Sequence, residues 1–149
     1  MSSIKLKIVT PEKLLLETEV SQVTLPVTFG EVTVLPEHIP YIGALSSGEV
    51  RFVEAAGDEV RLALSRGFVE FHDNVLTVLA ERAERAEDID IERAEAARKR
   101  AEELKNTTLE SADEEEYART VAMLDKELNR LRVARKHHSH RGASMHIDG

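Results

Sequence analysis

Apolar and polar residues alternate with a period of two along the first half of the chain. Ile4, Leu6 and Ile8 fall on one side of this pattern and Lys5 and Lys7 on the other, which predicts a half-buried strand. Similar short runs follow at 20–25, 32–35, 50–53, 60–64, 67–71 and 75–79. Turn residues separate them at intervals of roughly 8–12 residues, a spacing typical of an all-β sandwich or barrel.

The pattern changes near Glu81, where helix-forming residues take over. Neither Gly nor Pro occurs between Phe68 and His140, and Ala and charged residues dominate. Apolar positions then repeat at intervals of three and four, which places them on one helix face. They are Ile91, Ala94, Ala97, Ala101 and Leu104 in a first segment, and Tyr117, Val121, Leu124, Leu128 and Leu131 in a second.

A polar stretch between these segments predicts a turn. Asn106, Thr107 and Thr108 interrupt the apolar spacing. Ser111 and Glu114 have the spacing of a capping box, in which Ser111 is the N-cap of the second helix. Because a short connection favours antiparallel helices, we expect a helical hairpin over residues 88–136.

The seam of this hairpin is poor in apolar area. Its first helix offers mostly Ala where the second offers Leu. Burial of apolar surface stabilises by about 25 cal/mol per Å², so small side chains contribute little. We therefore expect a marginally held hairpin that can change partners at modest cost.

The last residues, 137–149, hold four of the six histidines and no periodic pattern. Unpatterned termini are generally poorly ordered, so we expect a disordered tail. His137, His138 and His140 have the chemistry to bind a divalent metal, but a structural or catalytic site needs fixed geometry and supporting contacts. We therefore predict no metal site.

Composition narrows the possible functions. The 28 acidic and 20 basic residues give a net charge of −8, which disfavours nucleic acid as a partner. The absence of cysteine excludes disulfides, thiolate metal sites and cysteine nucleophiles. No apolar run approaches the roughly 20 residues of a membrane helix, and the N-terminus has no signal character. We expect no direct membrane insertion and no export.

Motifs of catalytic chemistry are missing. The sequence has no Gly-x-x-x-x-Gly-Lys loop, no Gly-x-Gly-x-x-Gly, no His-Glu-x-x-His and no serine in a nucleophile elbow. Its carboxylates follow patterns of solvated helix faces or strand edges, where nothing marks one as a general acid. We predict no catalytic residue. A small hydrolase that uses surface carboxylates is the weakest alternative.

Two features suggest contacts with other molecules. Arg130, Arg132, Arg135 and Lys136 close the second helix with four positive charges. They either interact favourably with the helix macrodipole or form a docking patch for an acidic partner, and charge alone does not decide between these two interpretations. His38 lies in a rigid turn between two prolines. It is more often a structural hydrogen bonder in such a turn than a catalyst, and we include it as a docking candidate.

Four motifs follow one another along the first half. Thr-Pro-Glu lies at 10–12, and Gly-Glu-Val-Thr-Val-Leu-Pro-Glu-His-Ile-Pro at 30–40. Arg-Gly-Phe-Val-Glu-Phe lies at 66–71, and Asn-Val-Leu-Thr-Val-Leu-Ala at 74–80. Their order and spacing, with the helical pattern after them, resemble the epsilon subunit of the F-type (rotary) ATP synthase.

The chain departs from that family's motifs at several positions. Thr33, Glu37 and Arg66 stand where the family has glycine, and Phe71 where it has valine. Because glycine permits positive φ, these changes concern local turn shapes and not the strand pattern. The resemblance covers about residues 3–136.

The resemblance implies a fold and a function. The fold is a β-sandwich of about ten strands over residues 1–87, followed by an antiparallel two-helix hairpin over 88–136. The function is that of a non-catalytic central-stalk subunit in proton-driven ATP synthesis, coupling the rotor to the catalytic head. The implied partners are the gamma subunit, the membrane c-ring and the catalytic alpha and beta subunits. The implied location is the cytoplasmic face of a bacterial inner membrane.

The hairpin is implied to act as a brake on ATP hydrolysis. In one state it folds against the sandwich, and in another it extends along gamma toward the catalytic head. The weakly packed seam fits such a change of partner. In the extended state the basic cluster at 130–136 would meet an acidic region of a catalytic subunit, which favours the docking interpretation of that cluster.

One segment resembles family members that bind ATP in the hairpin. Their Ile/Leu-Asp-x-x-Arg-Ala motif matches Ile89, Asp90, Arg93 and Ala94, and Arg130 matches an arginine of their second helix. Asp90 and Arg93 share a helical face, so a carboxylate and a cation can meet one ligand. A second expected arginine is replaced by lysine, which lacks the bidentate fork. Alternatively, Asp90 only caps the helix and Arg93 is solvated.

ATP is then a regulatory ligand and not a required cofactor. It would favour the folded-down hairpin through its higher affinity for that state. The main alternative function is a free-standing ATP-sensing binding module, which binds ATP without a stable association with the synthase.

Overall fold

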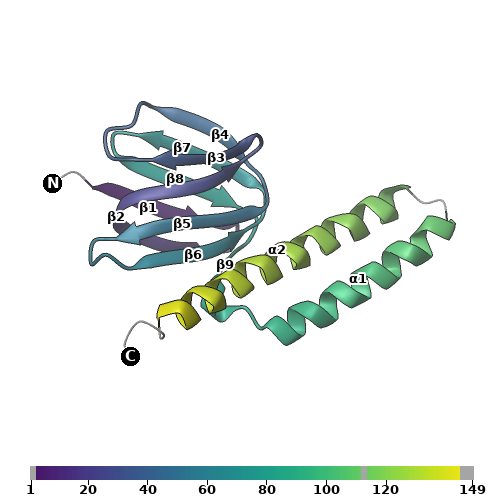
Figure 1. Cartoon of the computed structure of the whole chain (residues 1–149). Helices are drawn as coiled ribbons and strands as arrows, with labels where there is room; N and C mark the ends of the chain where they lie inside the picture. The colour runs from purple at the N-terminus through teal and green to yellow at the C-terminus, as the bar shows by residue number, and fades with distance from the viewer. Residues whose placement is uncertain (1–2, 112–113, 145–149) are drawn as a thin grey trace. The chain divides into compact units, whose positions relative to one another are not determined.

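The computed structural model describes residues 3–111 and 114–144. That part of the chain forms nine strands, one 3₁₀ turn and two α-helices (Figure 1). The strands are β1 (Ile4–Val9), β2 (Leu14–Val27), β3 (Gly30–Val34), β4 (Tyr41–Leu45), β5 (Gly48–Glu54), β6 (Glu59–Leu64), β7 (Gly67–His72), β8 (Val75–Ala80) and β9 (Ala83–Arg85). The helical elements are η1 (Ala86–Asp88), α1 (Ile91–Ser111) and α2 (Glu114–Ser144). The chain divides into two compact units, Met1–Arg85 and Ala86–Gly149.

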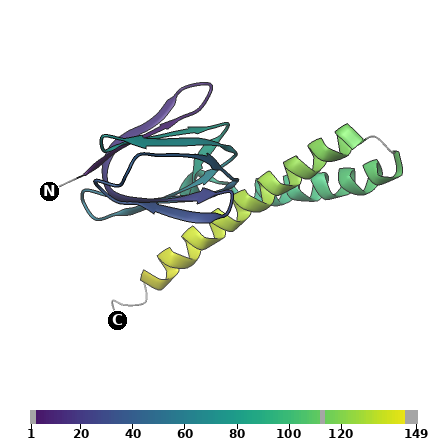
Figure 2. The same ribbon diagram turned by 90° about the horizontal axis from the view of Figure 1, so that it is seen from above.

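Two layers of strands form the first unit (Figures 1 and 2). β1, β8, β7 and β4 follow one another in one layer, and β3, β5, β6 and β9 belong to the other. The 14-residue strand β2 joins them, since it pairs with β1 along its first half and with β3 and β5 along its second. Among the described strands, β1 and β8 form the parallel pair and the other pairs are antiparallel.

Alternate residues of these strands fill the space between the layers. Ile4, Leu6 and Ile8 are fully buried, as the alternation predicted, and they belong to one cluster with Phe52 and Phe71. Burying one large apolar side chain stabilises by about 1.5–3 kcal/mol. This unit therefore has a core of its own.

The sequence pattern missed two details of the strands. Val20 and Val23 are both buried although they are three residues apart, because an irregularity between Val20 and Gln22 shifts the phase of β2. The short strand β9 pairs with β6 after the point where the helical pattern begins. The described residues thus contain nine strands where about ten were expected, and the sandwich-plus-hairpin fold class is confirmed.

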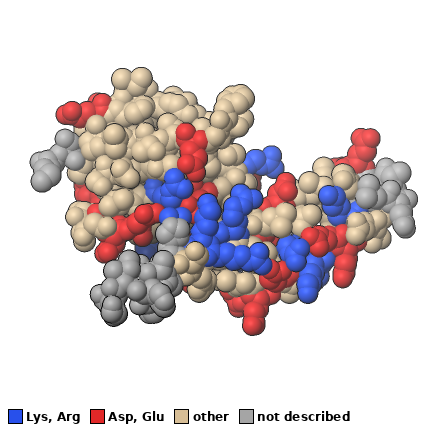
Figure 3. All heavy atoms as spheres, in the orientation of Figure 1, with Lys and Arg blue, Asp and Glu red and all other residues tan. Residues whose placement is uncertain are grey.

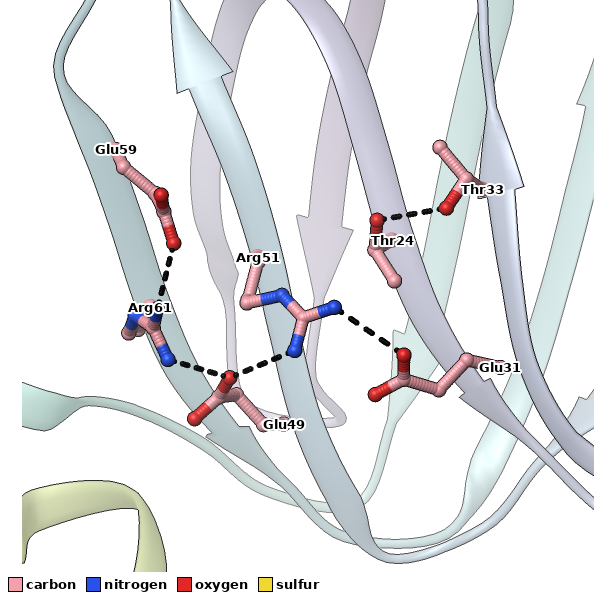
Figure 4. Close-up of polar contacts among 7 residues, drawn as sticks. All are labelled: Thr24, Glu31, Thr33, Glu49, Arg51, Glu59 and Arg61. Carbon is pink, nitrogen blue, oxygen red and sulfur yellow. Dashed lines mark hydrogen bonds and ion pairs between the residues drawn. The ribbon is translucent and has the colours of Figure 1, made fainter. Parts of the chain in front are cut away.

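A row of ion pairs crosses the outer face of β3, β5 and β6 (Figure 4). Glu49 Oε1 lies 3.4 Å from Arg51 and 3.0 Å from Arg61. Arg51 also reaches Glu31 at 3.2 Å, and Arg61 reaches Glu59 at 2.9 Å. The two arginines lie directly opposite each other, where like charges destabilise a sheet, so the carboxylate between them offsets this repulsion. Glu49 is only 8% exposed, unlike the solvated carboxylates that the sequence predicted.

Two turns use left-handed backbone without glycine. Glu37 has a φ of 67°, at a position where the resemblance led us to expect glycine. Its backbone N–H donates a 2.7 Å hydrogen bond to Asn74 Oδ1. Asp73 and Asn74, with φ of 51° and 58°, form the two-residue connection between β7 and β8, as hairpins of this length require. The turn at Glu37 therefore persists without glycine.

An antiparallel helical hairpin forms the second unit, since Glu95 near the start of α1 pairs with Arg135 near the end of α2. Four of the predicted seam residues are buried: Ala94, Ala101, Leu124 and Leu131. Leu104 and Leu128, also predicted for the seam, remain 47% and 39% exposed. The seam is thus built from small side chains on α1. No helix in the described part of the chain is long and apolar enough to cross a membrane.

Two predictions about the hairpin are wrong. α1 continues to Ser111, so this residue ends the first helix and is not the N-cap of the second. Polar residues there weaken the helix only slightly, and Thr107 Oγ1 donates to the carbonyl of Glu103 at 2.9 Å. α2 continues to Ser144, so residues 137–144 are helical and not disordered, because each residue added to a helix forms another hydrogen bond. Residues 112–113 and 145–149 lie outside the described residues.

Candidate functional site

The start of α1 carries the motif that resembles an ATP site. Asp90 precedes the helix, and its Oδ1 accepts a 3.1 Å hydrogen bond from the backbone N–H of Arg93. Asp90 is therefore the N-cap, as the structural alternative proposed. Ile89 and Ala94 are buried, whereas the Asp90 and Arg93 side chains are exposed. The motif thus presents one carboxylate and one cation to solvent.

Arg130 does not complete this site in the structure. It is partly buried, and its guanidinium pairs with Glu127 of the same helix at 2.8 Å. Within the described residues, neither Asp90 nor Arg93 forms a hydrogen bond or ion pair with it. The ATP site at Ile89, Asp90, Arg93, Ala94 and Arg130 stays a prediction.

The other three residues of the basic cluster at 130–136 line a hollow between the two helices, which we call the cationic hollow. Its volume is about 580 Å³. Four cations line it, and Glu95 is the acidic residue among its lining side chains; the cations are Arg98, Arg132, Arg135 and Lys136. Leu128 and Leu131 form its apolar part. Figure 3 shows Lys and Arg side chains gathered over the C-terminal half of α2.

Glu95 connects the cations of the two helices. One oxygen pairs with Arg98 at 3.0 Å and the other with Arg135. The hydrogen bond from Arg98 is the main cause that lowers the pKa of Glu95, opposed by partial desolvation and aided by nearby positive charges. Arg98 also pairs with Glu102 at 2.9 Å, and these contacts raise the pKa of Arg98. Glu95 and Arg98 are therefore both charged at neutral pH.

Sequence reasoning missed Glu95 and Arg98. Their signal is present, because Glu95, Arg98 and Glu102 have the i, i+3 and i, i+4 spacing of ion pairs on one helix face. It was not distinctive, since the first helix has many charged residues at such spacings. Only the pairing of α1 with α2 shows which of them meet the basic end of the second helix.

His38 has structural partners within the sandwich. Its Nδ1 lies 2.7 Å from the carbonyl oxygen of Ile39. The ring stands edge-on to Phe71 and Tyr41, at centroid distances of 5.9 and 6.4 Å. These contacts fix the ring, and its docking role stays a prediction.

An apolar surface crosses the outer face of β4, β7 and β8. Ala44, Phe68 and Leu79 lie side by side in register. Phe68 is 63% exposed, Leu79 47% and Ile42 77%. Ala44, Phe68 and Leu79 line a hollow of about 730 Å³, together with residues that include Arg66. Exposed apolar patches of this kind generally mark interaction sites.

Models of two protein families match the chain in succession. The first, described as the ATP synthase delta/epsilon chain β-sandwich domain, covers residues 3–86. The second, described as the long α-helix domain of the same chains, covers residues 87–135. The two matches meet where the sandwich gives way to the hairpin, and together they define the class of ATP synthase delta/epsilon chains.

Curated relatives agree with these matches. The ATP synthase epsilon chain of Nitratidesulfovibrio vulgaris strain DP4 is 47% identical over 131 residues, covering 88% of this chain and 95% of the relative. That of Geobacter sulfurreducens is 42% identical over 134 residues, covering 89% and 94%. The chain therefore belongs to the family of ATP synthase epsilon chains.

A solved structure shows the same fold. A chain in the cryo-EM structure of the Euglena gracilis mitochondrial ATP synthase, with OSCP, F1 and the c-ring in rotational state 1, aligns with a TM-score of 0.71. The alignment covers 83% of this chain and 76% of that chain at 23% identity. At this identity the likeness concerns the fold alone.

Proposed function

We propose that this chain is a non-catalytic central-stalk subunit of an F-type ATP synthase, which couples the rotor to the catalytic head and restrains ATP hydrolysis through its hairpin. The observation that carries the proposal is the match of both units, in order, to ATP synthase epsilon chains. The complex acts at the cytoplasmic face of a bacterial inner membrane. Catalysis belongs to its other subunits.

The sandwich supplies the anchoring surfaces in this proposal. The exposed apolar row of Phe68, Leu79 and Ile42 offers a docking face for the gamma subunit. A second apolar set lies in loops, where Phe29 is fully exposed and Ile39 is 75% exposed. This set offers contacts to the c-ring. An apolar set on strands and another in loops suit a subunit that joins two partners.

The hairpin supplies the restraint. Ala94 and Ala101 on α1 bury little area, so separating α1 from α2 costs less than opening a seam with leucines on both helices. In the extended state, Arg132, Arg135 and Lys136 meet an acidic region of a catalytic subunit. Arg130, which pairs with Glu127 at 2.8 Å, stays a docking candidate in this proposal.

ATP is the proposed regulator of this movement. Asp90 and Arg93 remain exposed at the start of α1, which leaves them accessible to a nucleotide. ATP would act by preferring the folded-down state. Calorimetry of the full-length chain with millimolar ATP tests this point, and the absence of heat would remove it.

The central experiment measures ATP hydrolysis by the cognate catalytic head stripped of this subunit. Full-length chain and a version of residues 1–87 are titrated separately into the same preparation. We expect both to bind and only the full-length chain to inhibit. If both bind and neither inhibits, the coupling role stands and the brake is wrong. If neither binds, the proposed function is wrong and a free-standing ATP-sensing module becomes the better explanation.

A further inference from the structure

The cationic hollow brings together more positive charge than the helix ends require. Arg132, Arg135 and Lys136 lie about two turns or more before the end of α2 at Ser144, outside the last turn where the macrodipole favours cations. Arg98 lies in the first half of α1, whose nearer end is positive. The macrodipole therefore gives no reason for the cations on either wall of the hollow.

The arginines of the hollow differ in their contacts. Arg98 and Arg135 share the Glu95 carboxylate. Among the described side chains, which leave out those of residues 108–113 and 140–149, Arg132 forms no hydrogen bond or ion pair, and its side chain is exposed. The lining carries four positive charges against the single negative charge of Glu95, and Glu102, just outside the lining, pairs with Arg98 at 2.9 Å. This imbalance suits an anionic ligand.

We propose that the cationic hollow binds a phosphate-bearing anion, held by Arg132 and Arg135 of α2 together with Arg98 of α1. Guanidinium groups present paired N–H donors that match phosphate oxygens. The volume of about 580 Å³ lies within the range of about 300–1,000 Å³ that small-molecule sites have. Leu128 and Leu131 close one side with apolar surface, which reduces competition from water.

This site is separate from the motif at the start of α1. Neither Asp90 nor Arg93 lines the hollow. The ligand would instead bridge two helices, and α1 and α2 must be paired for Arg98 and Arg132 to reach it together. Because it binds only the closed hairpin, such a ligand stabilises that form by mass action.

Glu95 acts as an internal competitor for this ligand. Its two oxygens already occupy Arg98 and Arg135, so an incoming phosphate must share or displace these contacts. Replacing the carboxylate by the neutral amide of similar shape removes the competition. Glu95→Gln should therefore bind the anion more tightly than the natural chain.

Titration calorimetry of the full-length chain with sodium pyrophosphate at low ionic strength tests the proposal. Arg132→Gln should weaken binding about three- to tenfold, since tenfold corresponds to about 1.4 kcal/mol and charged hydrogen bonds contribute about that much. Glu95→Gln should strengthen it about threefold. Arg119→Gln is the matched control. Arg119 is also on α2 but 72% exposed and outside the hollow, so its loss removes the same charge and should change affinity less than about twofold.

Parallel titrations with ATP distinguish the sources of the phosphate. If Arg132→Gln weakens both ligands, the hollow accepts the triphosphate of a nucleotide as well as free pyrophosphate. If ATP binding depends on Arg93 and pyrophosphate binding on Arg132, the nucleotide binds elsewhere and the hollow takes free phosphate compounds. Both results support the proposal.

Three results would overturn it. They are no heat at millimolar pyrophosphate, equal losses in Arg119→Gln and Arg132→Gln, or a loss of pyrophosphate binding in Arg93→Gln that Arg132→Gln does not show. The test uses the chain without a catalytic head, so its failure is distinguishable from failure of the proposed brake.

Discussion

The sandwich and the hairpin bury their apolar residues in different ways. In the sandwich, large side chains such as Phe52, Phe71 and Leu62 are almost completely buried in one cluster. In the hairpin, the buried positions described on α1 are Ala94 and Ala101, and of the leucines in the seam Leu124 and Leu131 are buried whereas Leu104 and Leu128 stay 47% and 39% exposed. Since stabilisation scales with apolar area removed from water, the first unit is suited to be a fixed anchor and the second a part that can open.

The largest expected effect is a loss of sandwich stability on substitution of Gly67. A Cβ at Gly67 would lie 1.8 Å from the carbonyl oxygen of Leu79, which is backbone of the paired strand and cannot move aside alone. Gly67→Ala should therefore destabilise the chain by about 3 kcal/mol. Urea denaturation followed by circular dichroism measures this. Ser47→Ala, at an exposed turn, is the control, and a loss below about 1 kcal/mol at Gly67 would show that β7 and β8 separate easily.

A matched pair of leucines compares the two units directly. Leu62 is 1% exposed in the sandwich and Leu131 is 2% exposed in the hairpin. Leu→Ala at either position should cost about 2–5 kcal/mol locally, because both leave a cavity. We expect hydrogen exchange to rise throughout the strands for Leu62→Ala, and only in α1 and α2 for Leu131→Ala. Faster exchange in both units for either variant would contradict the division into two units.

The spacing of apolar residues predicted most of the fold, because the strand period of two and the helix spacing of three and four each reflect burial on one face of the element. Ile4, Leu6 and Ile8 were identified from alternation, and the helical spacing found Leu124 and Leu131. The errors arose where residues of low helix propensity lie inside a continuous helix. A stretch of Asn and Thr suggested a turn, but the helix continues through it to Ser111, since an unfavourable residue costs less than a lost helical turn.

The candidate sites were less accessible to sequence reasoning. Asp90 and Arg93 could be recognised because their spacing lies within one helix, and the structure shows Asp90 in the capping role that was the alternative. Glu95, Arg98 and Arg132 come from two helices separated by the turn. Their meeting depends on the register of α1 against α2, which no local pattern determines.

A smaller effect is a gain in sandwich stability, which would increase the difference in stability between the sandwich and the hairpin. Glu37 adopts a φ of 67°, which costs a residue with a Cβ about 1 kcal/mol or more. Glu37→Gly should stabilise the sandwich by about 0.5–1 kcal/mol, after allowance for the greater freedom of glycine in the unfolded chain. The midpoint of urea denaturation measures it. The backbone hydrogen bond to Asn74 is kept in this variant, whereas Asn74→Ala removes it and should lower stability. A destabilised Glu37→Gly would mean that the Glu37 side chain itself supports the turn.

The smallest effect concerns the electrostatic connection between the two helices. Because Arg98 lowers the pKa of Glu95, the carboxylate contributes to hairpin stability above its ordinary pKa of 4.5. This contribution is lost as the pH falls from that value through the lowered pKa of the folded chain. Carbon-detected NMR of the Glu95 carboxyl should give a titration midpoint below 4.5 in the natural chain.

Two variants separate the contributions to that midpoint. Arg98→Gln should return it close to the ordinary value, since the hydrogen bond from Arg98 is the main cause of the shift. Arg135→Gln should raise it less, since Arg135 acts through a weaker charge interaction from the other helix. A midpoint that does not respond to Arg135→Gln would show that Arg135 of α2 does not pair with Glu95 of α1 in solution. The hairpin would then lack the interhelical ion pair, and the contrast with the well-packed sandwich would be larger than the structure indicates.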